Sequence, residues 1–252
     1  MKIGDVYEAL NAWAPVSTAM QGDNVGLLAG CAADEAEGAV AALDCTMDVI
    51  REAVRCGANL IVTHHPVIFH PLRRLVAGSF DADRVSALLR GGISVISLHT
   101  NLDSAEGGVN DCLAGRLGLS GVEPLPGGDG IARMGALAER METDAFLRLV
   151  RTRLGAEGLR ASRTRREIRR VAVGGGACAE YLDAAAAAGC DALVTADCKH
   201  HQYLEAAHLG LLLTDATHYA TENVVVPELA RRLRGLGLTV REARTENPVR
   251  GI

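Results

Sequence analysis

Short apolar runs of strand type alternate with helical segments along most of this chain. In the N-terminal half the alternating strands and helices are residues 39–43, 48–55, 59–63, 83–90 and 92–98. Thr46 is a candidate N-cap of the first of these helices, and Gly57 is a candidate stop at its C-terminus. Strands that alternate with helices are typical of α/β proteins, so the pattern predicts an α/β fold with mostly parallel sheets.

A similar pattern returns in the C-terminal half, beyond a segment rich in Pro and Gly at residues 119–130. There GCDALVTAD, residues 189–197, aligns with GANLIVTHH, residues 57–65. This similarity favours two related α/β lobes that arose by duplication, although any two βαβ units share such a pattern. We predict a first lobe over residues 1–125 and a second lobe over residues 126–252.

Composition excludes several classes of protein. The chain has 252 residues, 48% of them apolar, and no run of 18 apolar residues that would span a membrane. Asp5 and Glu8 lie where a signal peptide would be basic and then apolar, and the seven cysteines form no CxxC pair. A net charge of −5 argues against a general nucleic-acid binder. We therefore expect a soluble, cytoplasmic protein that binds neither membranes nor nucleic acid.

Side chains of the types that bind metals directly follow three of the predicted strands. They are His64 and His65, then His99 and Asp103, and finally His218 and Glu222. Ligands of open α/β sheets bind beyond the carboxyl ends of the strands, so we expect these side chains to converge. We interpret all of them as metal ligands except His99, which we interpret as a hydrogen-bonded structural residue.

Three imidazoles and two carboxylates are more than one tetrahedral ion with an open position needs. They suit two divalent ions about 3.5–4 Å apart, with Glu222 as a bridging ligand. The adjacent side chains of His64 and His65 diverge, which suits one ligand for each ion. Mixed nitrogen and oxygen donors are compatible with Zn, Fe, Mn or Ni and do not select among them.

These motifs resemble the dinuclear-metal family called NIF-three-like, also named GTP cyclohydrolase 1 type 2. The blocks that carry the resemblance are L-D-C-T at 43–46, T-H-H-P-V-I-F at 63–69, H-T-N-L-D at 99–103 and D-A-T-H-Y-A-T-E at 215–222. The resemblance implies the same five ligands, His64, His65, Asp103, His218 and Glu222. It also implies a two-lobed α/β subunit, a metal site in the cleft between the lobes, and a homohexameric ring. The short boundary segment leaves no room for the extra domain that some members carry.

The segment T-A-D-C-K-H-H at 195–201 is the counterpart in the second lobe of the T-H-H-P turn. Its polar residues Asp197, His200 and His201 are candidate catalytic groups that would move protons or contact the substrate. A polar turn that caps the following helix explains them equally well. Ala196 stands where members of this family often have glycine, and Asp197 keeps its place in the segment.

Two further features suit an anionic substrate. Gly174, Gly175 and Gly176 join a predicted strand to a helix, where free N–H groups would bind phosphate, although a tight turn also explains them. Nine arginines lie between Arg148 and Arg170, and they would steer a nucleotide toward the site or form an ordinary solvated surface.

A pair of metal ions activates water and polarises the electrophile that the water attacks. We therefore predict a dinuclear metal-dependent hydrolase that acts on a small molecule through a metal-bound hydroxide. The family resemblance implies GTP as substrate, with opening of its imidazole ring and release of formate. The alternative is a non-catalytic oligomer that stores or delivers metal, or that acts as a regulatory partner. Both alternatives require the same ligands.

Overall fold

The computed structural model describes residues 1–250, which form two compact units. Unit 1 comprises Met1–Glu106 and Val225–Glu246, and unit 2 comprises Gly107–Val224 together with the C-terminal residues from Asn247. This division differs from the predicted boundary between residues 125 and 126. It differs because the chain returns to unit 1 near its end, where β11 (Val240–Glu242) pairs with β2 (Ala39–Ala42).

Unit 1 contains a five-stranded sheet in the order β1-β4-β3-β2-β11. Strands β11, β2, β3 and β4 run parallel to one another, and β1 is an antiparallel edge strand. The remaining strands of this sheet are β1 (Gly26–Ala29), β3 (Leu60–Thr63) and β4 (Ser94–Ser97). The first, second and third predicted strands of the N-terminal half are therefore confirmed.

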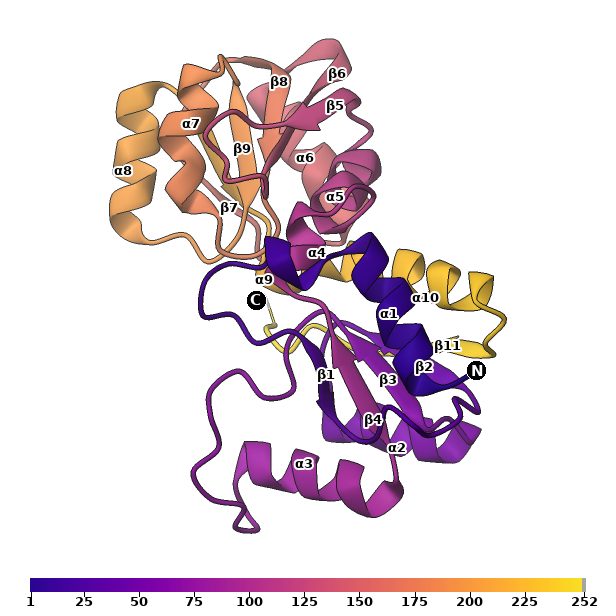
Figure 1. Ribbon diagram of the computed structural model, residues 1–252. Coiled ribbons are helices and arrows are strands. Elements are labelled where there is room, and N and C mark those ends of the chain that lie inside the picture. Colours follow the sequence, from indigo (N-terminus) through magenta and orange to yellow (C-terminus); the bar gives the residue numbers. More distant parts are fainter. Residues whose placement is uncertain (251–252) are drawn as a thin grey trace. The chain divides into compact units, whose positions relative to one another are not determined.

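Helices cover both faces of the unit 1 sheet (Figure 1). On one face α2 (Met47–Cys56) and α3 (Phe80–Gly91) pack their apolar residues against alternate residues of β2, β3 and β4. On the other face lie α1 (Ile3–Trp13) and α10 (Val226–Gly235), while the short helix α4 (Thr100–Ser104) follows β4.

Unit 2 contains a six-stranded sheet in the order β5-β6-β8-β9-β10-β7. Strands β8, β9 and β10 are parallel, whereas β5, β6 and β7 run antiparallel to their neighbours. The strands are β5 (Ser120–Pro124), β6 (Arg133–Glu142), β7 (Arg160–Ala161), β8 (Glu167–Val173), β9 (Ala192–Thr195) and β10 (Leu212–Asp215).

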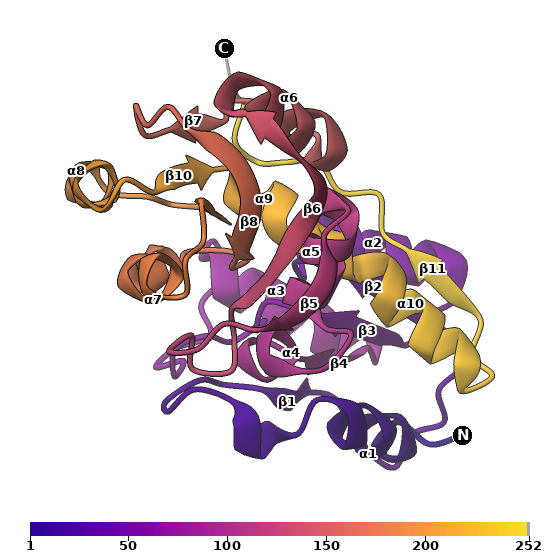
Figure 2. The same cartoon turned by 90° about the horizontal axis from the view of Figure 1, so that it is seen from above.

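The central strands of unit 2 have apolar residues on both faces. Val171 and Val173 of β8 belong to the core beneath α5 and α6, and Ala172 belongs to the core beneath α7 and α8. This alternation follows from the two-residue period of a strand. Figures 1 and 2 show the two pairs of helices on opposite faces of this sheet. The helices are α5 (Val109–Leu117), α6 (Thr143–Leu154), α7 (Leu182–Ala187) and α8 (His200–Leu209).

The two units share one strand arrangement. The order β1-β4-β3-β2 in unit 1 matches β7-β10-β9-β8 in unit 2, and in both the first strand is the antiparallel edge. The predicted α/β fold with two related lobes is thus confirmed, and unit 2 adds the antiparallel strands β5 and β6. None of the helices within residues 1–250 is long and apolar enough to cross a membrane.

Both predicted limits of the helix after β2 are confirmed. The Thr46 hydroxyl accepts a hydrogen bond from the Val49 amide at 3.3 Å, and Gly57 ends the helix in the left-handed conformation. Asp48 lies in the first turn, where a negative charge favours the helix dipole.

This cap provides a test of local stability. We expect Thr46→Ala to lower the free energy of unfolding by about 1 kcal/mol, because an N-terminal amide of α2 loses its acceptor. Ser79 also precedes a helix but makes no side-chain cap hydrogen bond, so Ser79→Ala is the matched control and should change stability by less than about 0.5 kcal/mol. Urea denaturation monitored by circular dichroism measures both, and equal losses would contradict the assignment.

Candidate metal site

His64 and His65 follow β3 directly and continue its parallel ladder. The His64 amide donates to the Ala42 carbonyl at 3.3 Å, and the His65 amide donates to the Leu43 carbonyl at 2.9 Å. The Thr63 hydroxyl donates to the His65 carbonyl at 2.8 Å. These backbone contacts fix where both imidazoles leave the sheet, and the His64 side chain is fully buried.

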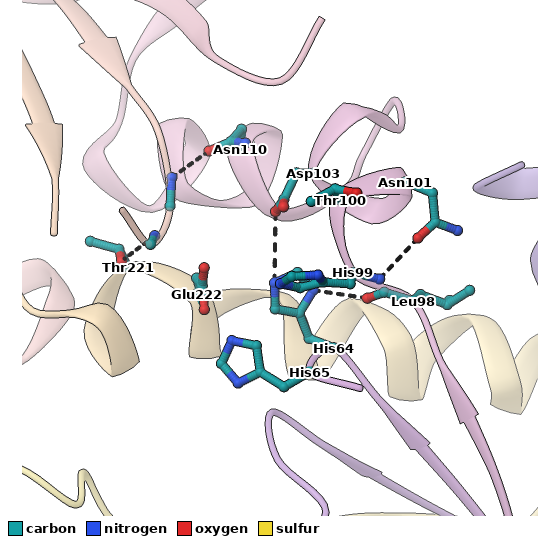
Figure 3. Close-up of polar contacts among 12 residues, drawn as sticks. His64, His65, Leu98, His99, Thr100, Asn101, Asp103, Asn110, Thr221 and Glu222 are labelled. Carbon is teal, nitrogen blue, oxygen red and sulfur yellow. Dashed lines mark hydrogen bonds and ion pairs between the residues drawn. The ribbon is translucent and has the colours of Figure 1, made fainter. Parts of the chain in front are cut away.

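Each of these imidazoles is held by an acceptor at its Nδ1 atom. His64 Nδ1 lies 2.9 Å from the Leu98 carbonyl oxygen (Figure 3), which only accepts, so Nδ1 carries the proton. His65 Nδ1 lies 2.7 Å from Oδ1 of Asp44 at the end of β2. With Nδ1 as donor, Nε2 keeps the lone pair, which is the usual arrangement of histidines that bind metals.

Asp103 lies on α4, which begins directly after β4. Its Oδ1 atom is 3.7 Å from His64 Nε2 (Figure 3). Two donors about 2.1 Å from one tetrahedral ion are separated by about 3.4 Å, so this pair has nearly the spacing of two ligands on one ion. The imidazole and the carboxylate therefore fit a divalent metal.

His99, at the end of β4, is the third imidazole of this cluster. Its Nδ1 lies 2.9 Å from Oδ1 of Asp23, a carboxylate whose side chain is only 4% exposed. Burial raises the pKa of Asp23, but hydrogen bonds from His99 and Thr100 outweigh this effect and hold that pKa well below its ordinary value. Asp23 is therefore an ionised acceptor for His99.

The structure gathers His64, His65 and His99 in unit 1, with one ring nitrogen of each within 4.8 Å of the others. His99 was expected to be a hydrogen-bonded structural residue, and its bond to Asp23 agrees with part of that prediction. Its place beside the other two imidazoles agrees with the expected convergence of the side chains that follow these strands. The spacing His99-x-x-x-Asp103 repeats in His218-x-x-x-Glu222.

In unit 2, His218 and Glu222 lie on α9 (His218–Glu222), directly after β10. His218 Nδ1 is 2.6 Å from Oδ2 of Asp197, and His218 Nε2 is 2.9 Å from Oε2 of Glu222. With Nδ1 held by the Asp197 carboxylate, Nε2 and the Glu222 carboxylate face each other at a distance that suits a shared proton or a metal ion.

Asp197 and His218 lie in turns that contain strained backbone. Asp197 and Thr217 have φ angles of 53° and 66°, which are uncommon for residues other than glycine. The buried carboxylate of Asp215 ties down both turns, because it accepts hydrogen bonds from the Cys198 and Thr217 amides. Arg160 of the edge strand β7 pairs with Asp215 and balances its charge.

The three consecutive glycines do not form the suggested phosphate cradle. Their amides donate to the Val194 carbonyl, to Oδ1 of Asn110 and to Oγ1 of Thr221, at 3.0, 2.7 and 3.1 Å. Figure 3 shows the acceptors Asn110 and Thr221. No glycine amide of this run remains to bind an anion. Gly176 leaves room for Glu222, because a Cβ atom at position 176 would lie 2.2 Å from Oε1 of Glu222 and would displace that carboxylate.

The remaining candidates, Asp197, His200 and His201, lie at or just before the start of α8. Asp197 contacts His218, so it positions an imidazole. His200 and His201 are exposed in the first turn of α8, and within residues 1–250 the structure records no hydrogen bond or ion pair from either imidazole. In the arginine-rich segment, Arg166 pairs with Asp191 in addition to the Arg160 pair described above.

Two cysteines follow the aspartates that accept hydrogen bonds from His65 and His218. Cys45 follows Asp44 and Cys198 follows Asp197, and both are buried. Burial raises the pKa of each thiol to about 12. Both therefore stay protonated at neutral pH in the absence of a metal ion.

Comparison with known proteins identifies relatives over nearly the whole chain. The Duf34/NIF3 (NGG1p interacting factor 3) family profile matches residues 1–248. A Nostoc protein named GTP cyclohydrolase 1 type 2 homolog is 38% identical over 246 residues, which cover 94% of this chain and 93% of the relative. A Clostridium perfringens protein of the same name is 30% identical over 240 residues, covering 93% and 92%.

Solved structures agree with these relatives. A hypothetical protein from Staphylococcus aureus matches with a TM-score of 0.94 and 28% identity, covering 100% of this chain and 99% of that one. Reduced HcgD from Methanocaldococcus jannaschii matches with a TM-score of 0.80 and 28% identity, covering 95% and 96%. From the profile match and the curated relatives together, this chain belongs to the Duf34/NIF3 (NGG1p interacting factor 3) family.

Proposed function

We propose that this protein is a dinuclear metal-dependent hydrolase. Its proposed ligands are the five residues His64, His65, Asp103, His218 and Glu222. The proposal rests on the hydrogen-bond acceptor that each of the three imidazoles has at Nδ1. Because Nδ1 is occupied in this way, Nε2 of each ring is the nitrogen that would bind a metal. Neutral imidazole and carboxylate donors together suit Zn, Fe, Mn or Ni.

When bound, a pair of divalent cations supplies Lewis acidity and lowers the pKa of water. The protein's own residues prepare for this by fixing the donors before any cation arrives. Asp44 and Asp197 hold the rings of His65 and His218, and the Leu98 carbonyl holds the ring of His64. Such preorganisation lowers the entropy cost of assembling the ligands.

For the substrate we propose a nucleotide, with GTP as the first candidate. The names of the Nostoc and Clostridium relatives supply this candidate, and the geometry of each unit is equally suited to other hydrolytic reactions. We also propose that the protein works as a homo-oligomer, with a hexamer as the first arrangement to test.

Metal content tests the ligand assignment. We expect the purified protein to bind two equivalents of a divalent metal, and we expect the double variant His64→Ala, Glu222→Ala to bind less than one. Elemental analysis after dialysis measures both. His208 is exposed on α8 and belongs to no proposed ligand set, so His208→Ala is the control and should retain two equivalents. Two equivalents in the double variant would contradict the assignment.

Gly176→Ala tests whether the glycine makes room for Glu222. The new methyl group would meet Oε1 of Glu222 at 2.2 Å, so we expect the variant to lose metal. Gly189 has a similar φ of 71°, but a Cβ atom there would have nothing within 4 Å, which makes Gly189→Ala the matched control for backbone strain. It should lose about 1–2 kcal/mol of stability and keep its metal. Equal metal loss in both variants would contradict this role of Gly176.

Turnover separates the hydrolase from the metal-storage alternative. We expect the metal-loaded protein to release formate from GTP, and chelation should abolish the release because the water and the electrophile lose their Lewis acid. Phosphoesters form the second substrate panel. Two bound equivalents of metal with no turnover of GTP or of this panel would favour the non-catalytic alternative.

A further inference from the structure

We propose that a cavity between α1 and α10 binds a small carboxylate with a flat apolar body. Both helices cover the same face of the unit 1 sheet (Figure 1). The cavity measures about 240 Å³, and none of the proposed metal ligands lines it. This inference therefore concerns a second site and goes beyond the proposed function.

The apolar part of the lining suits a small ring. Ala9, Leu10 and Trp13 line the cavity from α1, and Gly235 and Leu236 line it at the end of α10. Gly235 keeps this part open, because a Cβ atom there would meet nothing within 4 Å. A cavity of about 240 Å³ is slightly smaller than the roughly 300–1,000 Å³ of pockets for drug-sized ligands, so it suits a smaller metabolite.

Two contacts fix the ring of Trp13 in this lining. The indole Nε1 donates a hydrogen bond to the Glu106 carbonyl at 2.8 Å. The guanidinium of Arg232 lies over the indole, 3.8 Å from the ring centroid. This cation–π contact orients both groups, so α1 and α10 together present an aromatic ring and a positive charge to the cavity.

Arg232 supplies the positive charge that a carboxylate needs. Its Nε atom donates to Oε1 of Glu228 at 2.8 Å, and its side chain is 32% exposed. Within residues 1–250 the structure records no hydrogen bond from the two terminal nitrogens of this guanidinium. A guanidinium with available N–H groups binds a carboxylate through charge-assisted hydrogen bonds, which are stronger than those between neutral groups.

The charged groups beside the cavity favour a single negative charge on the ligand. Arg231 also lines the cavity, and its Nε and Nη2 atoms donate to Glu228 at 2.7 and 2.6 Å. The hydrogen bonds from Arg231, together with those from Arg232, outweigh burial and hold the pKa of Glu228 below its ordinary value. One ionised carboxylate between two guanidinium groups leaves one positive charge, which a monocarboxylate would neutralise.

The test uses the full chain and the signals of Trp13. This residue is the only tryptophan in the sequence, so its fluorescence and its single indole peak in proton–nitrogen NMR spectra report on the cavity. We expect benzoate to change both signals saturably. Benzamide has the same ring without the charge, so it should bind at least tenfold more weakly.

Two variants with matched controls locate the site. Arg232→Gln should weaken benzoate binding at least tenfold, whereas Arg234→Gln should leave it unchanged, because Arg234 pairs with Glu242 and does not line the cavity. Gly235→Leu should fill the cavity and also weaken binding at least tenfold. Gly115→Leu is its control, since this glycine of α5 also has nothing within 4 Å of an added Cβ atom and lies outside the lining. Thermal unfolding curves verify that each variant is folded.

Three results would overturn the proposal. The first is benzoate that shifts neither Trp13 signal, and the second is benzoate that binds folded Arg232→Gln and Gly235→Leu as tightly as the parent protein. The third is tighter binding of phenyl phosphate than of benzoate, which would contradict the preference for a monocarboxylate. None of these measurements involves a metal, so the carboxylate site and the proposed function are tested separately.

Discussion

The hydrogen bond at Nδ1 of each imidazole is the interaction on which the candidate site depends. A neutral imidazole exposes a lone pair at only one nitrogen, and the partner of the other nitrogen decides which one. Leu98, Asp44, Asp23 and Asp197 provide that partner for the four histidines. With all four partners in place, Nδ1 of each imidazole is committed to an acceptor, and Nε2 is the nitrogen that faces the candidate site.

The turns that position Asp197 and His218 reduce the stability of the fold. Asp197 and Thr217 adopt backbone conformations that cost about 1–3 kcal/mol each, and Asp215 offsets this cost by bonding to both turns. A buried carboxylate needs a balancing charge, which Arg160 supplies from the edge strand. One of the nine arginines that suggested nucleotide steering thus has a structural role close to the site.

The sequence predicted the strands and the residues that follow them, because both signals are local. Apolar runs such as residues 59–63 and a histidine pair directly after the strand can be recognised without the fold. The partners could not be predicted in this way, since Asp23 and His99 are 76 residues apart and meet only through tertiary structure. A lone histidine at a strand end looks structural until its neighbours in space are known.

The glycine run shows why a local motif can be compatible with two functions. Three glycines between a strand and a helix suit a phosphate cradle if their amides face solvent, and suit a tight packing site if they do not. Asn110 and Thr221 decide between these alternatives by accepting hydrogen bonds from the amides of Gly175 and Gly176. Because both acceptors belong to helices far along the chain from the run, the local sequence could not exclude phosphate. The missing side chain at Gly176 leaves space for the Glu222 carboxylate, so this motif contributes to the candidate metal site.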